Sequence, residues 1–239
     1  MDNISSAFTK LHMPGMASCW RTLNETHQTD RLSFSDGLEL LLQSELASRR
    51  NNRIARLIRS ANFKQHACIE ELEASDARGI PAGAVSQLAT GEYLKAGATI
   101  IISGPTGTGK SFLACALGEG ACRLGYKVKY YTVSRLLDEL KLARIEGHEL
   151  KFFEKIERLD LIIIDDFGML RLEGQQQNDF EQIIDDRYHK KSLIISSQLP
   201  VADWYGVFSN EILAEACLDR LVHKSLRFEL RGDSMRKKY

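Results

Sequence analysis

An aliphatic run that leads directly into a glycine-rich loop constrains this chain more than any other feature. Residues 99–102 are β-branched, the loop follows as Gly104-Pro-Thr-Gly-Thr-Gly-Lys-Ser111, and an alanine- and leucine-rich segment comes next. Strand, loop and helix in that order are the context in which the pattern G-x-x-x-x-G-K-[ST] binds phosphate. The sequence therefore predicts the phosphate-binding unit of an α/β protein.

Each part of this loop has a chemical reason. Backbone N–H groups of a glycine-rich loop can converge on a polyphosphate because no Cβ atom blocks the approach of its oxygens. Lys110 would reach the outer phosphates, and Ser111 would begin the helix and offer its hydroxyl to Mg²⁺. A glycine turn that only joins strand to helix is the alternative, which the complete Gly-Lys-Ser ending disfavours. The residues expected to bind the polyphosphate are Gly104, Pro105, Thr106, Gly107, Thr108, Gly109, Lys110 and Ser111.

Two carboxylates after another aliphatic run supply the second half of the predicted site. Residues 161–164 are Leu-Ile-Ile-Ile, and Asp165 and Asp166 follow. An unbroken apolar strand is typical of a parallel sheet covered on both faces, and ligands gather at the carboxyl ends of such strands. We expect Asp165 to hold Mg²⁺ through water, beside Ser111, and Asp166 to polarise the attacking water. A pair of loop acids or helix caps is the alternative.

Three further polar residues lie late in the chain. A strand predicted over 192–198 ends in Gln198, whose amide would orient the nucleophilic water or touch the terminal phosphate. The alternative is an amide that only caps the turn before the next proline. Arg220, within a helix predicted over 211–223, and Arg236, near the C-terminus, are interpreted on residue type alone as a surface ion pair and a basic tail.

Composition excludes several classes of protein. Lys and Arg together number 32 and so do Asp and Glu, so the whole molecule has no electrostatic preference for nucleic acid. Five scattered cysteines without a C-x-x-C pair argue against both a disulfide framework and a zinc site and favour a reducing cytosol. No apolar run reaches membrane-spanning length, so we expect a cytoplasmic protein without a membrane partner.

Positive charge is concentrated locally, between residues 47 and 69, where no acidic residue occurs. On a helical wheel Arg49, Arg53 and Arg56 share one face, and another face carries the apolar residues Ile54, Leu57, Ile58 and Ala61. We predict that this ridge binds nucleic-acid phosphates without sequence preference; a solvated face paired with acids elsewhere is the alternative. The periodic pattern breaks between 70 and 95, so we predict an N-terminal helical DNA-binding or partner domain over 1–75 and a nucleotide domain over 76–239. The residues expected to bind DNA are Arg49, Arg50, Arg53, Arg56, Arg59 and Lys64.

Several motifs together resemble the AAA+ ATPases, and within them the IstB family. These motifs are the phosphate loop, the aliphatic strand that ends in Asp-Asp, the polar strand end before Leu-Pro, Leu218-Asp-Arg-Leu-Val-His223 and Gly232-Asp-Ser-Met-Arg236. IstB proteins are helper ATPases of insertion-sequence transposition and are similar to bacterial helicase loaders of the DnaC type. The resemblance extends from about residue 38 to residue 236.

This resemblance implies an α/β fold: an AAA+ P-loop NTPase core with a five-stranded parallel sheet between helices, and a small N-terminal all-α domain. The Asp165 strand would be separated from the phosphate-loop strand by the Gln198 strand. ATP and Mg²⁺ are the implied cofactors, and a bacterial cytoplasm is the implied location. By motif position Gln198 is similar to sensor 1, Arg220 to an arginine finger that acts on a neighbouring subunit's ATP, and Arg236 to sensor 2.

Two departures from the family pattern stand out. Asp166 occupies the position where AAA+ proteins more often have glutamate, and its shorter arm places the carboxylate farther from its water. The chain ends shortly after the predicted last strand, 227–230, so the helical C-terminal lid is expected to be absent or vestigial.

The expected function follows from the family. We expect an ATPase that assembles as a homo-oligomer, ring or helical, on duplex target DNA and recruits or stimulates the transposase of the same insertion element. A DnaC-like loader, which would hold a replicative helicase, is the alternative with the same motifs. A small-molecule kinase would need an acceptor-binding lid with several arginines before residue 192, and the sequence shows no such cluster.

Overall fold

The computed structural model describes residues 3–29 and 31–235, which form two compact units that meet in sequence between Arg56 and Leu57. The domain boundary predicted from sequence, after residue 75, therefore lies later in the chain than the boundary between these two units. The difference has a hydrophobic cause, since Ala61 and Ala67 are buried in the core of the second unit and Leu57 packs against that core. Residues 57–75 are therefore part of the nucleotide domain's packing.

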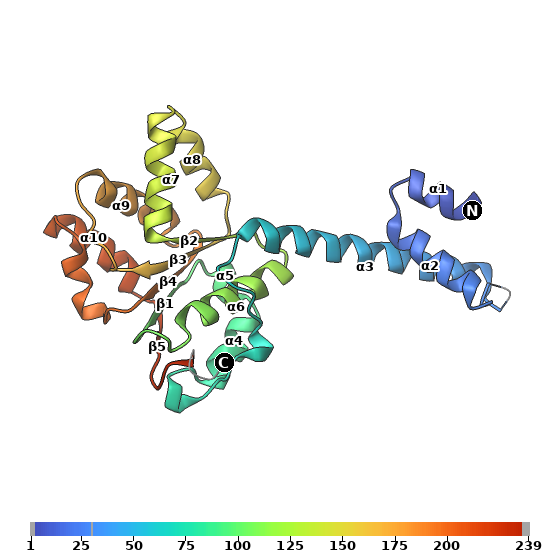
Figure 1. The fold of residues 1–239 in the computed structure, drawn as a ribbon, viewed down its shortest axis with the longest axis horizontal. Coiled ribbons are helices and arrows are strands. Elements are labelled where there is room, and N and C mark those ends of the chain that lie inside the picture. Colours follow the sequence, from blue (N-terminus) through green and yellow to red (C-terminus); the bar gives the residue numbers. More distant parts are fainter. Residues whose placement is uncertain (1–2, 30, 236–239) are drawn as a thin grey trace. The chain divides into compact units, whose positions relative to one another are not determined.

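The regular elements of the first unit, within its described residues, are all helices. Glu45 is buried on α3, and its carboxylate accepts hydrogen bonds from the backbone N–H groups of Gly15 and Met16 at 2.8 and 3.1 Å. It thereby satisfies two donors at the beginning of α2 that have no partner inside the helix. Each helix can be followed in Figure 1. The bounds are α1 (Asn3–Lys10), α2 (Pro14–Glu25) and α3 (Phe34–Ala61), of which residues 57–61 belong to the second unit.

Helix α3 begins at a side-chain cap. The Ser33 hydroxyl donates to the Asp36 carboxylate at 2.7 Å and accepts from the Asp36 backbone N–H at 3.2 Å. This reciprocal pair resembles a capping box.

The second unit alternates strands and helices. Its first part has the 3₁₀ turns η1 (Ile69–Glu71) and η2 (Asp76–Arg78), then α4 (Ala82–Ala89), α5 (Glu92–Lys95), β1 (Thr99–Ser103), α6 (Lys110–Arg123) and β2 (Val128–Thr132). Its second part has α7 (Val133–Ile145), α8 (Glu149–Glu157), β3 (Leu161–Phe167), α9 (Gln175–Arg187), β4 (Ser192–Ser197), η3 (Val201–Val207), α10 (Glu211–Val222) and β5 (Leu226–Glu229).

The five strands form one parallel sheet in the order β2-β3-β4-β1-β5. The strand that ends in Asp165 is thus separated from the phosphate-loop strand by β4, as the family resemblance implies. No α-helix follows β5 among the described residues. Within the described residues no helix has the length and apolarity needed to cross a bilayer.

Alternating side chains of the sheet enter two separate cores. On β3, Leu161 and Ile163 join α6 and residues 57–98 on one face, whereas Ile162 and Ile164 join α7 to α10 on the other. This alternation is the period of two that a strand imposes. Figure 1 shows the sheet with α4 and α6 on one side and α9 and α10 on the other. The apolar strands predicted from sequence are therefore covered on both faces.

The alternation is interrupted at the end of β3. Pairing with β4 shifts register between Ile164 and Phe167, and Asp166 has a φ of 60°. A bulge of this kind re-aims a side chain, and a left-handed backbone is uncommon for a residue with a Cβ atom. The bulge lies at the two aspartates that the sequence predicts to be functional.

Substitution Phe180→Ala tests the second core. Phe180 is fully buried, with its ring centroid 5.3 Å from that of Phe167 and 6.2 Å from that of Phe208. We expect the free energy of unfolding in urea to fall by about 3–5 kcal/mol, because burial and ring contacts are lost and a cavity remains. The control Leu150→Ala, at a side chain 80% exposed, should change it by less than about 0.5 kcal/mol. Equal effects of the two variants would contradict this packing.

Candidate nucleotide-binding site

The phosphate loop is closed around the side chain of its own lysine. Lys110 is buried, and its ammonium donates to the carbonyl oxygens of Gly104 and Pro105 at 2.7 and 2.8 Å. Gly109, with a φ of 98°, lies directly before α6. The loop thus ends at a helix N-terminus, where backbone N–H groups and the helix dipole favour an anion. A phosphate would offer Lys110 charged acceptors in place of these carbonyls.

A segment after β5 lies against the loop. Gly107 has a φ of 86°, and a Cβ atom at this position would clash with the Ser234 side chain. The Met235 backbone N–H donates to the Gly107 carbonyl at 2.9 Å. Glycine at position 107 therefore allows both the left-handed backbone and the close approach of the C-terminal segment, because it has no Cβ atom.

The carboxylate of Asp165 is the most enclosed charge of the site. Its side chain is 1% exposed and accepts hydrogen bonds from Ser111 at 2.6 Å, from Tyr130 at 2.5 Å, and from Ser196. Burial raises the pKa of Asp165, but these hydroxyls, Ser111 foremost, outweigh burial and hold the pKa below its ordinary value. Asp165 is therefore ionised at neutral pH.

Ser111 and Asp165 together suit a hard divalent cation. Their oxygens are already adjacent, and Mg²⁺ prefers oxygen ligands. The structure thus brings together the two residues predicted to hold the metal, one from the beginning of α6 and one from the end of β3. Their donor set fits Mg²⁺ held beside the phosphate loop.

Tyr130 and Ser196 belong to this site but were not among the residues predicted from sequence. Tyr130 pairs with Ile163 across β2 and β3, and its phenol reaches the buried carboxylate from a strand that had no predicted functional residue. Burial, followed by the hydrogen bond to Asp165, raises the pKa of Tyr130, so the phenol remains a donor. A hydroxyl after the aliphatic run 193–195 was the only sequence feature that could have pointed to Ser196.

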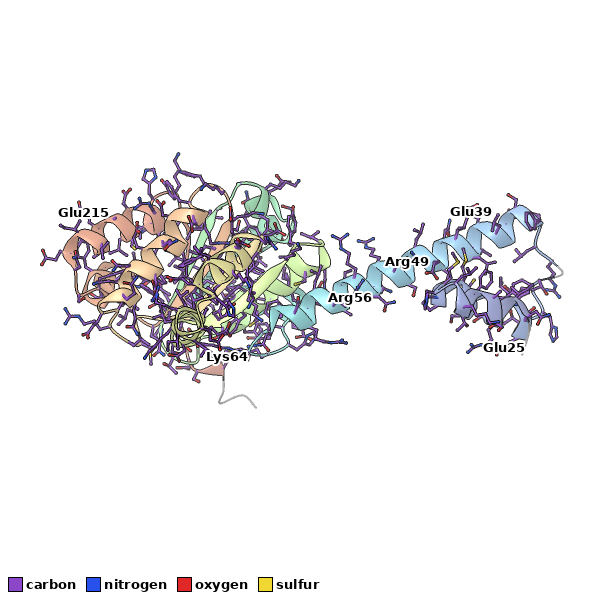
Figure 2. All side chains as sticks on the ribbon, turned by 90° about the horizontal axis from the view of Figure 1, so that it is seen from above. Glu25, Glu39, Arg49, Arg56, Lys64 and Glu215 are labelled. Carbon is purple, nitrogen blue, oxygen red and sulfur yellow. The ribbon has the colours of Figure 1, made fainter. Side chains whose placement is uncertain are left out.

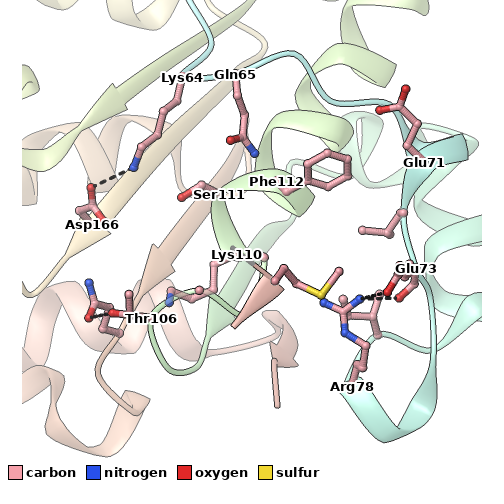
Figure 3. A pocket seen from close by; sticks show the side chains of 16 residues that line it. Lys64, Gln65, Glu71, Glu73, Arg78, Thr106, Lys110, Ser111, Phe112 and Asp166 are labelled. Atoms are coloured by element: carbon pink, nitrogen blue, oxygen red, sulfur yellow. Dashed lines mark hydrogen bonds and ion pairs between the residues drawn. The ribbon is translucent and has the colours of Figure 1, made fainter. Parts of the chain in front are cut away.

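Lys64 lies in this site and apart from the arginines with which it was grouped. Its ammonium is 3.5 Å from Asp165 Oδ2 and 3.6 Å from Asp166 Oδ2, and Figure 3 shows it extending toward Asp166. Neighbouring side chains of a regular strand point to opposite faces. The bulge at Asp166 explains how one ammonium can face both carboxylates.

Gln198 lies at the edge of the same cavity. It lies just after β4, and its amide oxygen accepts a hydrogen bond from the Thr106 hydroxyl of the phosphate loop at 2.6 Å. The strand end and the loop are thus in direct contact. This position suits a polar group that faces the terminal phosphate.

The loop and the strand ends line a cavity of about 550 Å³. Leu72, Ile80, Phe112 and Met235 give it apolar walls, and Arg78 on the same rim donates to the Thr108 carbonyl at 3.1 Å. A volume of this size and a mixed lining are typical of small-molecule sites. This lining suits a nucleotide, because its base could lie among the apolar side chains and its phosphates at the loop (Figure 3).

Arg220 is not part of this cavity. Arg220 lies on α10, where its guanidinium is 2.8 Å from Asp185 and 3.6 Å from Glu181 of α9, and it does not line the cavity. In this one copy of the chain it thus makes the surface ion pair that residue type alone suggested. Arg236 lies outside the described residues.

The five arginines predicted to bind DNA are all exposed on α3. Figure 2 shows Arg49 and Arg56 projecting from this helix. Arg49 pairs with Glu45 at 2.7 Å, so the ridge is not wholly without a local acid, and this hydrogen bond lowers the pKa of Glu45. Among the described residues, Arg50, Arg53, Arg56 and Arg59 have no acidic partner within ion-pair distance.

Comparison with known proteins places the chain. The sequence model of the family described as IstB-like ATP binding protein matches residues 6–239. The chain belongs to this family. A relative named as an insertion-sequence ATP-binding protein, from Sinorhizobium fredii, is 37% identical over 94% of this chain and 92% of its own length. The protein named for the same role in IS21, from Pseudomonas aeruginosa, is 27% identical over 100% of this chain and 90% of its own.

Solved structures show the fold of this IstB-like protein to be that of AAA+ P-loop proteins. The crystal structure of the DnaC helicase loader superposes with a TM-score of 0.59 at 20% identity and covers 69% of this chain and 97% of that one. DnaA from Aquifex aeolicus, bound to AMPPCP, has a TM-score of 0.60 at 22% identity and covers 74% of this chain and 54% of that one.

Substitution Tyr130→Phe tests the Asp165 hydrogen bonds. We expect the free energy of unfolding to fall by about 1–3 kcal/mol, since a charged acceptor loses one donor. The folded pKa of Asp165 lies below the ordinary value of 3.8, so its contribution to stability is present above that value and is lost only as the pH falls through the lower folded pKa.

The effect of Tyr130→Phe should therefore be the same at about pH 5 and about pH 8 in urea unfolding. Tyr126→Phe, which removes a phenol outside the site, serves as the matched control and should have little effect. An effect that shrinks between these two pH values would mean that Asp165 titrates in that range, contrary to the geometry.

Proposed function

We propose that this IstB-like protein is a Mg²⁺-dependent ATPase of DNA transposition. It would bind ATP, assemble as a homo-oligomer on duplex target DNA, and recruit or stimulate the transposase of its own insertion element in the bacterial cytoplasm. The observation that carries the proposal is the contact between Ser111 and the buried, ionised Asp165 at the base of the phosphate loop. The names of the relatives support the link to insertion sequences.

The proposed chemistry is divided among residues of the cavity. ATP supplies a terminal phosphoryl group that water attacks. Lys110 would neutralise the outer phosphates, Ser111 and Asp165 would hold Mg²⁺, and Asp166 would accept a hydrogen bond from the attacking water. Gln198 would orient that water. Because little covalent chemistry falls to the protein in phosphoryl transfer, positioning and charge account for most of its effect.

Arg220 would complete the site in a neighbouring subunit. It lies away from the cavity of its own chain, on α10 and partly exposed. For this role its guanidinium would exchange Asp185 for the phosphate of a neighbour's ATP. Hydrolysis then depends on assembly, because the developing charge is stabilised only where two subunits meet.

DNA binding is assigned to the exposed arginines of α3. They are long cations on one helix within a chain of zero net formal charge. Contacts from such residues to phosphates are individually modest, but an oligomer repeats them along the duplex. We therefore infer tight, salt-sensitive binding with little base preference, strengthened when ATP drives assembly.

Charge reversal on α3 tests this assignment. Arg53→Glu with Arg56→Glu should weaken duplex binding at least tenfold, alike on unrelated sequences, and should flatten its salt dependence. The same charge change at Lys151 and Arg158 of the α8 region is the matched control. Fluorescence anisotropy with and without a non-hydrolysable ATP analogue provides the measurement. If the analogue does not tighten DNA binding by the unchanged protein, the proposed function is lost.

A mixing experiment tests the shared active site. Asp166→Asn should bind ATP but not hydrolyse it, and Arg220→Ala should bind ATP and lose the stimulation of hydrolysis by DNA and assembly. Mixed in equal amounts, the two inactive variants should recover about a quarter of the wild-type rate, since random assembly gives that share of interfaces both intact groups. No recovery in assembled mixtures would remove the role of Arg220 in a neighbour's site.

A helicase loader remains the second candidate, because the DnaC likeness extends over almost all of that chain. The two functions share the ATPase core and differ in the protein partner. Co-purification with transposase and with replicative helicase, each added with ATP analogue, distinguishes them. Retention of the helicase alone would favour the loader.

A further inference from the structure

The turn that follows α3 delivers a second lysine to the nucleotide cavity. We propose that Lys64 binds the terminal phosphate of ATP and thereby lets the site distinguish ATP from ADP. The inference deepens the proposed function and rests on nucleotide binding at the phosphate loop. Lys64 lies outside the phosphate-loop, aspartate, sensor and arginine-finger motifs that identify the family from sequence.

Geometry places the ammonium where the terminal phosphate is expected. Lys64 lines the same cavity as Lys110, Ser111 and Gln198. Its Nζ lies 3.5 Å from the Asp165 oxygen that accepts from Ser111, and 3.6 Å from Asp166. Asp166 is the residue proposed to act on the water that attacks the terminal phosphate. The ammonium thus lies at the end of the site where the terminal phosphate is expected, and not among the apolar side chains that suit the base.

The backbone that carries Lys64 is firmly anchored. Ala61 and Ala67, on either side, are buried in the core, and Asn62 ends α3 with a φ of 57°. Phe63 packs so closely on α6 that a Cβ atom at Gly118 would lie 2.6 Å from its ring. These contacts fix the turn that aims Lys64 toward the cavity.

Helix α6 also holds the turn through polar groups. Burial raises the pKa of the Cys115 thiol, hydrogen bonds with the backbone of Gln65 and Lys64 oppose this rise, and the net pKa is about 11. His66 lies 2.9 Å from the buried carboxylate of Glu119. Because α6 begins at Lys110 and Ser111, one rigid helix positions the phosphate loop and the base of the Lys64 side chain together.

Charge gives the reason for a cation at this place. Two carboxylates next to a triphosphate repel it, and the repulsion is largest for the terminal phosphate. The Lys64 ammonium faces both carboxylates, and the side chain as a whole is 41% exposed, so the ammonium can take a phosphate oxygen as a further partner. ADP lacks the terminal phosphate and would leave the ammonium with the aspartates alone. Lys64 is in this sense a positioning residue for the triphosphate.

The test compares the affinities for a non-hydrolysable ATP analogue and for ADP, by calorimetry on the full chain. Lys64→Met should weaken binding of the analogue about tenfold and that of ADP less than threefold, as expected for loss of one charged hydrogen bond. Lys64→Arg keeps the charge and should retain most of the wild-type ratio. Lys95→Met, which removes an exposed lysine paired with Glu92, is the matched control.

The ratio of the two affinities in Lys64→Met either supports the proposed role of Lys64 or contradicts it. An unchanged ratio in Lys64→Met, or tighter binding of the analogue, would overturn it, because the ammonium would then only neutralise the aspartates or compete with the metal. Thermal melting confirms that the variant folds, and Lys64→Gln replaces it if it does not. Wild-type protein that binds neither nucleotide would instead defeat the proposed function, a result distinct from a failure of Lys64.

Discussion

A buried carboxylate, Asp165, is the interaction on which the rest of this structure depends. An ionised group in a protein interior is costly unless hydrogen bonds and opposite charge compensate for lost water. Here the compensation comes from Tyr130 on β2, Ser111 on α6 and Ser196 on β4. These hydroxyls meet only if the strands adopt the order β2-β3-β4 and the phosphate-loop helix packs across them. The site and the core of the sheet therefore form together.

The same place in the sheet shows how a regular strand is modified for chemistry. A continuous strand would send adjacent aspartates to opposite faces, and only one would meet the nucleotide. The bulge and the left-handed backbone at Asp166 change that direction. Backbone outliers of this kind persist where the surroundings enforce them. Phe167, the residue after Asp166, packs its ring against those of Phe180 and Trp204, and this packing provides such surroundings.

The basic segment supplies residues to two proposed sites that are adjacent in sequence. Its arginines lie exposed on α3, whereas Lys64 enters the nucleotide cavity three residues after that helix ends. In the proposed function, DNA would bind to the helix and the terminal phosphate of ATP to the turn that follows it. Occupancy of the terminal-phosphate position and the state of α3 would then be linked through one short, anchored stretch of backbone. Arg220 would add a second dependence, on the neighbouring subunit.

The local units were predictable from the amino-acid sequence: the strand, loop and helix of the phosphate site, the aliphatic strand before Asp165, and the amphipathic pattern of α3. Periodicity and turn chemistry act over a few residues, so they can be read without a structure. Three features became visible only in the folded chain: Tyr130 and Ser196 complete the Asp165 site, Lys64 lies in the nucleotide cavity, and residues 57–75 pack with the second unit. These outcomes depend on which distant segments become neighbours across the sheet and on α6, and the spacing of residues along a chain does not specify that.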